Sequence, residues 1–248
     1  MLELEVMGTG RTVIIGHRGA MGHSPENTLA SFQKGLDLGA DVVELDIHLS
    51  RDGVPVVMHD ERVNRTTDGT GLVADMTLAE LKGLDAGRWF GREFEGEKIP
   101  TLKEVFDWAA GNVELVIEIK GHPKPQEGIE QKMLDLIRDY ELVEKTMVIS
   151  FYHPVVRAVK DLEPKLATGI LYGGYLADTV GTARAAGADS VRPNAGQWTP
   201  ELVREVHEAG LVASTWTVNE VDQYDELVRM GLDSIGTNYP DRFSERVV

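Results

Sequence analysis

The feature that most constrains the fold of this chain is a regular alternation between short runs rich in β-branched residues and segments with helical periodicity. The runs that we expect to be strands are Val13–Ile15, Val42–Leu49, Leu115–Ile119, Met147–Ser150, Thr168–Leu171, Ser190–Arg192, Val212–Val218 and Ser234–Gly236. Strands that alternate with helices along a chain form parallel sheets. Eight such units in 248 residues favour an α/β fold of the (β/α)8 TIM barrel type, for which about 250 residues is typical. No Gly-x-Gly-x-x-Gly motif follows the first strand, which weakens the case for a dinucleotide-binding sheet.

Local signals place the helices between these strands. Leu29, Phe32 and Leu36 recur at helical spacing, and Gly39 ends that segment. The other signals are a capping box from Thr101 to Glu104, the helix-opening pairs His153-Pro154 and Thr199-Pro200, a helix that runs to Ala186, and Asn219 as the cap of a helix through Leu227. This order predicts a single TIM-barrel domain over residues 1–248.

The stretch from Arg51 to Pro100 interrupts the alternation. It contains a turn at Arg51-Asp52-Gly53, a short apolar run at Val54–Met58 and a second capping box from Thr77 to Glu80. Connections in α/β folds are usually much shorter than this stretch. We therefore expect a small insertion after the second strand, at approximately residues 51–100, beside the mouth of the barrel.

The composition excludes several classes of protein. The formal net charge is −16 and the chain has no basic run, so nucleic acid is not expected as a partner. The absence of cysteine excludes disulfides, thiolate zinc sites and a cysteine nucleophile. No window approaches the roughly 20 apolar residues of a membrane-spanning helix, and Met1–Arg11 lacks a signal-peptide core. We therefore expect a cytoplasmic protein without stable membrane insertion.

Two of the expected strands carry acidic residues on one face. Side chains alternate along a strand, so Glu44 and Asp46 share one face of Val42–Leu49, and Glu118 takes an equivalent place on Leu115–Ile119. Seen alone, Glu44-Leu45-Asp46 would also fit an antiparallel strand with one face in water. Three carboxylates gathered inside a barrel are costly without a cation. Oxygen ligands of this kind favour Mg²⁺ or Ca²⁺ over zinc.

Two histidines follow strand ends, where the active sites of barrel enzymes form. His17 comes directly after the first strand, and His59 comes after Val54–Met58. Histidine is suited to proton transfer near neutral pH, so both are candidates for that role. His23, in the first loop, stays a candidate by its position. The other histidines lack this placement and are expected to be structural or exposed: His48, His122, His153 and His207.

An acidic surface repels an anionic substrate, so a phosphate site here must build its own positive pocket. Arg18 offers a two-pronged guanidinium for phosphate and Lys120 a point charge. Lys120 would alternatively neutralise a neighbouring carboxylate, and the two roles are compatible. The segment Ser24–Thr28 is typical of a helix start, so capping is its main expected role. Asn27 follows His17 in the same loop and could still reach the site.

At these residues the sequence resembles the glycerophosphodiester phosphodiesterases. The matching motifs, in chain order, are Gly16-His17-Arg18-Gly19, Pro25-Glu26-Asn27-Thr28, Glu44-Leu45-Asp46, Asp52-Gly53 through His59-Asp60, Arg65-Thr66-Thr67, Lys98–Leu102, Glu118-Ile119-Lys120, Trp216-Thr217-Val218-Asn219 and Tyr239-Pro240-Asp241. A single motif such as His-Asp is weak. The whole series covers nearly all of the chain and is highly specific.

The resemblance implies a metal-dependent hydrolase that converts a small glycerophosphodiester to glycerol 3-phosphate and an alcohol. It implies that Glu44, Asp46 and Glu118 bind the divalent cation, that His17 and His59 are the general base and acid, that Arg18 and Lys120 hold phosphate, and that Trp216 lies near the alcohol pocket. A plain core residue is an equal alternative for Trp216. We expect in-line displacement at phosphorus. Water and a neighbouring glycerol hydroxyl both remain open as the nucleophile, as do Mg²⁺ and Ca²⁺ as the cation.

Other functions remain open from the residues. A related phosphodiesterase or phospholipase on a similar barrel would act on another head group, although sphingomyelinases of the phospholipase D type are usually disulfide-bonded. A non-catalytic phosphate- or metal-binding barrel would be signalled by loss of a histidine or carboxylate, and all of them are present. A metal-assisted lyase or isomerase of the enolase-like kind would use Lys120 as its base. The preferred alcohol and the oligomeric state are also left open.

Overall fold

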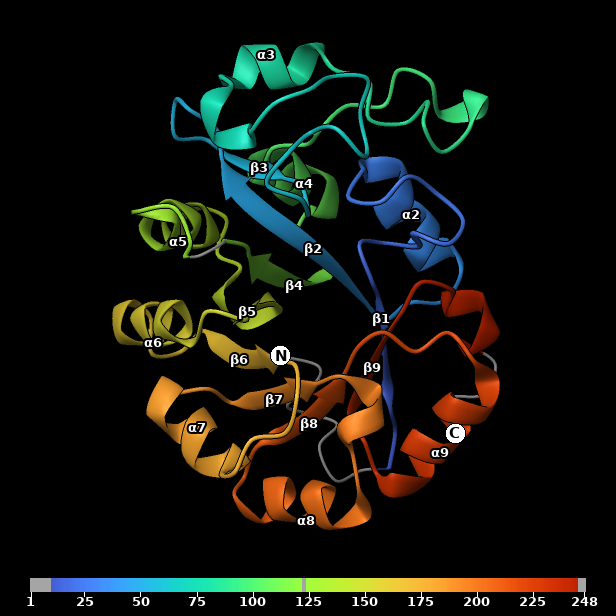
Figure 1. Cartoon of the computed structure of the whole chain (residues 1–248), viewed down its shortest axis with the longest axis vertical. Coiled ribbons are helices and arrows are strands. Elements are labelled where there is room, and N and C mark those ends of the chain that lie inside the picture. Colours follow the sequence, from blue (N-terminus) through green and yellow to red (C-terminus); the bar gives the residue numbers. More distant parts are fainter. Residues whose placement is uncertain (1–9, 122–123, 245–248) are drawn as a thin grey trace.

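The computed structural model describes residues 10–121 and 124–244, and within this part a ring of parallel strands forms the centre (Figure 1). Of the nine strands in the sheet, eight are parallel and close into a barrel, because β1 pairs with both β9 and β2. These eight are β1 (Val13–Gly16), β2 (Val42–Leu49), β4 (Glu114–Ile119), β5 (Thr146–Ser150), β6 (Ala167–Tyr172), β7 (Ser190–Pro193), β8 (Val212–Thr215) and β9 (Ser234–Thr237). The predicted (β/α)8 barrel is confirmed.

Helices surround the barrel on its outer side (Figure 1). They are α2 (Leu29–Asp37), α4 (Leu102–Ala109), α5 (Ile129–Asp139), α6 (His153–Leu162), α7 (Thr179–Ala186), α8 (Pro200–Glu208) and α9 (Val221–Met230). Short 3-10 turns lie at η3 (Val143–Lys145), η4 (Ala195–Gln197) and η5 (Pro240–Arg242). The predicted capping box at Thr101 and Glu104 opens α4, and proline occupies the first turn of α6 and α8. Across residues 10–121 and 124–244, no helix combines the length and apolar character that crossing a membrane requires.

The apolar face of β2 packs outward, as its alternation predicts. Val43, Leu45 and Ile47 are fully buried in a cluster with residues of the surrounding helices, among them Phe106 of α4. A separate cluster fills the barrel interior and includes Ile15 of β1. Because the outward face of β2 is taken by leucine, isoleucine and valine, Glu44 and Asp46 must point into the barrel.

The insertion after β2 contributes an extra strand outside the barrel. Strand β3 (Pro55–Val57) pairs antiparallel with the last residues of β2, where Ile47 faces Val57 and Leu49 faces Pro55. The rest of the insertion contains η1 (Val73–Asp75), α3 (Leu78–Gly83) and η2 (Arg92–Phe94), and it forms a small apolar cluster of its own. The predicted capping box at Thr77 and Glu80 opens α3. Figure 1 shows this segment to one side of the barrel, next to β3.

Two boundaries near β8 differ from the sequence prediction. The predicted strand Val212–Val218 ends at Thr215, because the next residue makes only an isolated bridge to Asn194. Asn219 does not cap α9, which begins at Val221 after Glu220. The Asn219 side-chain oxygen instead accepts a hydrogen bond from the backbone N–H of Asn238, at 3.0 Å. Because this oxygen bonds to the backbone of Asn238, it does not cap α9.

Three aspartates close the end of the barrel where the strands begin. Asp41, Asp189 and Asp233 each follow a helix that ends near a glycine with positive φ, namely Gly39, Gly187 and Gly231. Each carboxylate accepts a hydrogen bond from a backbone N–H of a neighbouring strand, from Ile14, Thr168 and Ala213 respectively, at 2.9, 2.9 and 2.7 Å. This end therefore serves stability, and the chemistry-bearing residues gather at the other end.

Candidate active site

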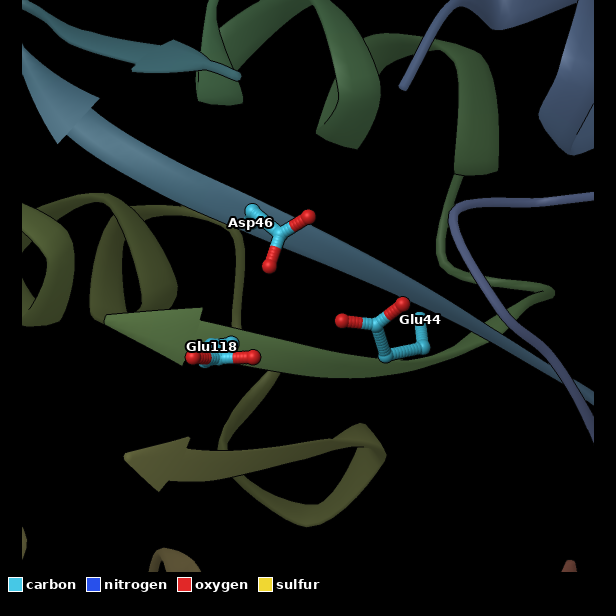
Figure 2. A group of neighbouring side chains, drawn as sticks. All are labelled: Glu44, Asp46 and Glu118. Atoms are coloured by element: carbon cyan, nitrogen blue, oxygen red, sulfur yellow. The ribbon is translucent and has the colours of Figure 1, made fainter. Parts of the chain in front are cut away.

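The three acidic residues converge inside the barrel. Asp46 of β2 is the register partner of Glu118 of β4, and Glu44 lies two residues earlier on β2. One carboxylate oxygen from each residue lies within 4.8 Å of the others. Figure 2 shows the three carboxylates close together over the neighbouring strands β2 and β4. Each residue is less than a tenth exposed, so the group lies in a setting where uncompensated negative charge is costly.

The electrostatics of the cluster fit a divalent cation. Burial, together with the charge of Asp46, raises the pKa of Glu118 to about 7 and that of Glu44 well above its ordinary value. Burial alone would raise the pKa of Asp46, but Lys120 and Arg18 hold it below its ordinary value. Asp46 Oδ1 is buried without a hydrogen-bond partner. An all-oxygen donor set with a free buried oxygen suits Mg²⁺ or Ca²⁺.

Arg18 and Lys120 supply the positive charge beside the carboxylates. The backbone N–H of Arg18 donates to Glu44 Oε2 at 2.7 Å, and its Nε lies 3.3 Å from Asp46 Oδ2. Lys120 Nζ donates to Glu118 Oε1 at 2.7 Å and lies 3.6 Å from Asp46 Oδ1. Both cations line the same pocket as Glu44 and Glu118. Their charge therefore offsets that of the carboxylates and also faces the pocket.

The histidine pair lines this pocket as well. His17 Nδ1 lies 2.7 Å from Asn238 Oδ1, and His59 Nδ1 lies 2.7 Å from Asp60 Oδ1. Burial, with the nearby charge of Arg18, lowers the pKa of His17 to about 4. Burial also lowers the pKa of His59, although the charge of Asp46 and the hydrogen bond to Asp60 oppose the shift. In each ring the hydrogen bond at Nδ1 leaves Nε2 as the nitrogen available for proton transfer.

The other histidines lie elsewhere. His23 is exposed, with its Nε2 2.9 Å from Asp241 Oδ1, and does not line the pocket. His48 is buried with its Nε2 3.2 Å from the backbone oxygen of His59. His153 and His207 contact Leu171 O and Asp233 respectively, and His122 lies outside the described residues.

Two aromatic residues, Trp216 and Phe151, form a wall of the same pocket. Trp216 lines it, donates from Nε1 to the backbone oxygen of Arg192 at 2.9 Å, and meets Phe151 edge to face at 5.3 Å between ring centroids. Phe151 is 46% exposed. Sequence reasoning missed Phe151 and Arg192 as pocket residues, although both follow the general signal of residues at the carboxyl ends of strands.

Several other residues at the site could not be assigned from spacing. Thr28 is the cap of α2, whereas Asn27 donates from Nδ2 to Asp46 Oδ2 at 2.8 Å and accepts from the Asp46 N–H at 3.2 Å. Asn27 therefore positions a candidate metal ligand. Asn238 supports His17 from the last loop of the barrel. The motifs that resemble the family did include Glu26, Asp60 and Arg65, but only the structure places them in contact.

Comparison with known proteins agrees with this geometry. The family model described as glycerophosphoryl diester phosphodiesterase family matches residues 17–242. A glycerophosphodiester phosphodiesterase of Caldanaerobacter subterraneus subsp. tengcongensis is 41% identical over 232 residues, which are 93% of this chain and 96% of that relative. The matched region contains every candidate site residue.

Solved structures agree in fold over almost the whole chain. A phosphodiesterase of Oleispira antarctica, in complex with the product sn-glycerol-3-phosphate, is 31% identical with a TM-score of 0.85, covering 96% of this chain and 97% of that one. A glycerophosphodiester phosphodiesterase of Agrobacterium tumefaciens is 30% identical with a TM-score of 0.84, covering 94% of this chain and 99% of that one. Together with the buried acidic cluster and the histidine pair, these similarities show that the chain belongs to the glycerophosphodiester phosphodiesterase family of phosphoric diester hydrolases.

Proposed function

We propose that this chain hydrolyses glycerophosphodiesters to glycerol 3-phosphate and an alcohol, with Mg²⁺ or Ca²⁺ held by Glu44, Asp46 and Glu118. The observation that carries the proposal is the cluster of three buried carboxylates, two of which, Glu44 and Glu118, line one pocket together with the two histidines. The product named in the Oleispira antarctica structure, sn-glycerol-3-phosphate, supports the choice of substrate. A divalent cation bound there would offset the negative charge that develops on a phosphoryl oxygen.

The charged side chains define where the phosphate would bind. Arg18 and Lys120 face the pocket from the side of β1 and β4. Both stay positively charged, because nearby carboxylates raise their pKa values although burial opposes the shift. Guanidinium and ammonium groups bind phosphate oxygens through charge-assisted hydrogen bonds. We infer that these two residues orient the diester so that one face of the phosphorus lies toward the histidine pair.

The histidines would move the protons. With a pKa of about 4, His17 is neutral at pH 7, and its Nε2 is free to accept a proton from the nucleophile. His59 Nδ1 lies 2.7 Å from Asp60 Oδ1, and this contact opposes the lowering of the His59 pKa by burial, so it favours the imidazolium form needed to protonate a leaving alcohol. Water and a neighbouring glycerol hydroxyl are both accessible nucleophiles in this arrangement. The aromatic wall of Trp216 and Phe151 would pack against carbon atoms of the substrate.

The state of Lys120 argues against an enolase-like lyase or isomerase. A lysine that removes a proton from carbon must be neutral for part of the time, and this requires a lowered pKa. The carboxylates of Asp46 and Glu118 raise the pKa of Lys120 instead. Lys120 is therefore suited to hold charge rather than to act as a base.

A head-group panel tests the proposal. The enzyme is treated with a chelator and dialysed, and then glycerophosphocholine, glycerophosphoethanolamine, glycerophosphoglycerol and glycerophosphoinositol are assayed with Mg²⁺ or Ca²⁺ added back. We expect glycerol 3-phosphate release only after metal is restored. Release of phosphocholine or another phospho-alcohol, or full activity under chelation, would contradict the proposed reaction or its metal dependence.

A further inference from the structure

Arg65, an arginine of the insertion, connects the loop of His59 to the loop of Arg18. Its Nη1 and Nη2 donate to the two carboxylate oxygens of Glu26, at 2.6 and 2.8 Å. Its Nε and Nη2 donate to the two carboxylate oxygens of Asp60, at 2.8 and 2.9 Å. One guanidinium group therefore makes bidentate hydrogen bonds to both carboxylates, which fixes the orientation of the two carboxylates as well as the distance between them.

Each carboxylate holds a residue of the pocket on its other side. Asp60 Oδ1 lies 2.7 Å from His59 Nδ1, and Glu26 Oε1 accepts a hydrogen bond from Arg18 Nη1 at 2.8 Å. A continuous series of short contacts thus runs from His59 through Asp60, Arg65 and Glu26 to Arg18. Arg65 itself is not among the residues that line the pocket.

The burial of Glu26 distinguishes this series from an ordinary surface ion pair. Exposed ion pairs contribute little, because water and salt screen them. Glu26 is 5% exposed, and both arginines hold its pKa below the ordinary value against the opposing effect of burial. A lysine at position 65 would keep the charge, but its single ammonium cannot bind four oxygens of two carboxylates in one plane.

We propose that Arg65 is a positioning residue for the reaction. It holds His59 through Asp60 and Arg18 through Glu26, and so fixes the position of one relative to the other. This inference rests on the proposed function, in which His59 transfers a proton and Arg18 holds the phosphate. Proton transfer requires heavy atoms about 2.6 to 3.2 Å apart, and a displacement of about 1 Å can cost about 100-fold in rate. The alternative is that Arg65 only fastens the insertion to the barrel.

Kinetics of Arg65→Gln and Arg65→Lys, with glycerophosphocholine and saturating Mg²⁺, test the role. We expect both variants to lose about 10- to 100-fold in kcat, the usual effect of removing a group that orients a residue of the site, while KM changes less than kcat. Arg62→Gln is the matched control, because it removes the same charge from an exposed position three residues earlier, and it should retain the activity of the unaltered enzyme. Asp60→Asn, which keeps the side-chain size, removes the negative charge that Arg65 binds and should cause a similar loss of kcat.

A double-mutant cycle separates positioning from fastening. In a His59→Ala background, Arg65→Gln should cause a smaller loss of kcat than it causes in the unaltered enzyme, because one of the two residues that it positions is gone. The same loss in both backgrounds, or full kcat in Arg65→Lys, would overturn the positioning role. So would unchanged kcat in both Arg65→Gln and Asp60→Asn. Those results leave the proposed function intact when the unaltered enzyme is active, whereas an inactive unaltered enzyme would overturn both.

Discussion

Asp46 of β2 and Glu118 of β4 are direct partners in the parallel register of the barrel. Because side chains alternate with a period of two, this register brings their carboxylates to the same interior face, and Glu44 joins them from two residues earlier on β2. A slip of one residue would turn Leu45 or Ile47 toward that face instead. The acidic cluster is therefore a property of strand pairing.

Metal should stabilise the folded chain through the three carboxylates. At a metal concentration of about 100 times Kd, binding adds about 2.7 kcal/mol to the free energy of unfolding, which corresponds to a rise in Tm of about 5–10 °C for a domain of this size. Glu44→Gln should abolish most of this rise. Glu127→Gln, at an exposed position, should keep it. A thermal melt with Mg²⁺ and Ca²⁺ titrations measures the effect, and an equal rise in both variants would place the metal elsewhere.

The contribution of Glu118 to the stability of the metal-free chain, measured as the difference between the unaltered chain and Glu118→Gln, should fall as pH rises. Glu118 has a pKa raised from 4.5 to about 7 in the folded state, so the folded state binds this proton more tightly than the unfolded state does. The stabilisation from this group is complete below about pH 4.5 and is lost as pH rises through about 7. Denaturant unfolding of both chains with a chelator present measures the trend. With saturating metal the trend should reverse, because the cation binds the deprotonated carboxylates.

The two histidines should respond differently to the leaving group. Each alanine variant should lose about 10²- to 10⁴-fold in kcat on glycerophosphocholine, with metal binding retained. The leaving group of a 4-nitrophenyl phosphodiester, 4-nitrophenolate, departs without protonation. On that substrate His59→Ala should therefore recover most of its rate, whereas His17→Ala should not. Steady-state kinetics on both substrates give the comparison. Recovery in His17→Ala alone would exchange the acid and base roles, and no loss in either variant would remove the pair from proton transfer.

Asn27 and Thr28 should have separable effects although they are neighbours. Asn27→Gly is compatible with the positive φ of 60° at this position but removes both hydrogen bonds to Asp46. We therefore expect the free energy of unfolding to fall by about 1–3 kcal/mol. We also expect metal affinity to be about 10- to 100-fold weaker. Thr28→Ala removes the cap of α2 and should cost about 1 kcal/mol with unchanged metal affinity. Chemical unfolding and calorimetric metal titration distinguish the two, and equal metal affinity in both variants would deny Asn27 its supporting role.

The strands, most helix starts and the acidic face could be predicted from sequence because they follow local rules. The period of two places Glu44 with Asp46, and the capping boxes at Thr77 and Thr101 open their helices as expected. Asn219 shows the limit of such rules. Its side chain is suited to capping, yet it accepts a hydrogen bond from the backbone N–H of Asn238. The partner belongs to a loop distant in the sequence, which a local rule does not take into account.

The sequence by itself determined the barrel, the inward face of the carboxylates and the strand end that carries His17, since these depend on periodicity and on the order of elements along the chain. His59 follows β3, which runs antiparallel outside the barrel, so the rule for barrel strand ends did not place it. Only the tertiary structure decided which residues support them. Asn238 contacts His17 across 221 positions of the chain, and Arg65 contacts Glu26 across 39. Such contacts depend on the paths of loops and on side-chain burial, which no local period encodes, and the same burial sets the pKa values of the site.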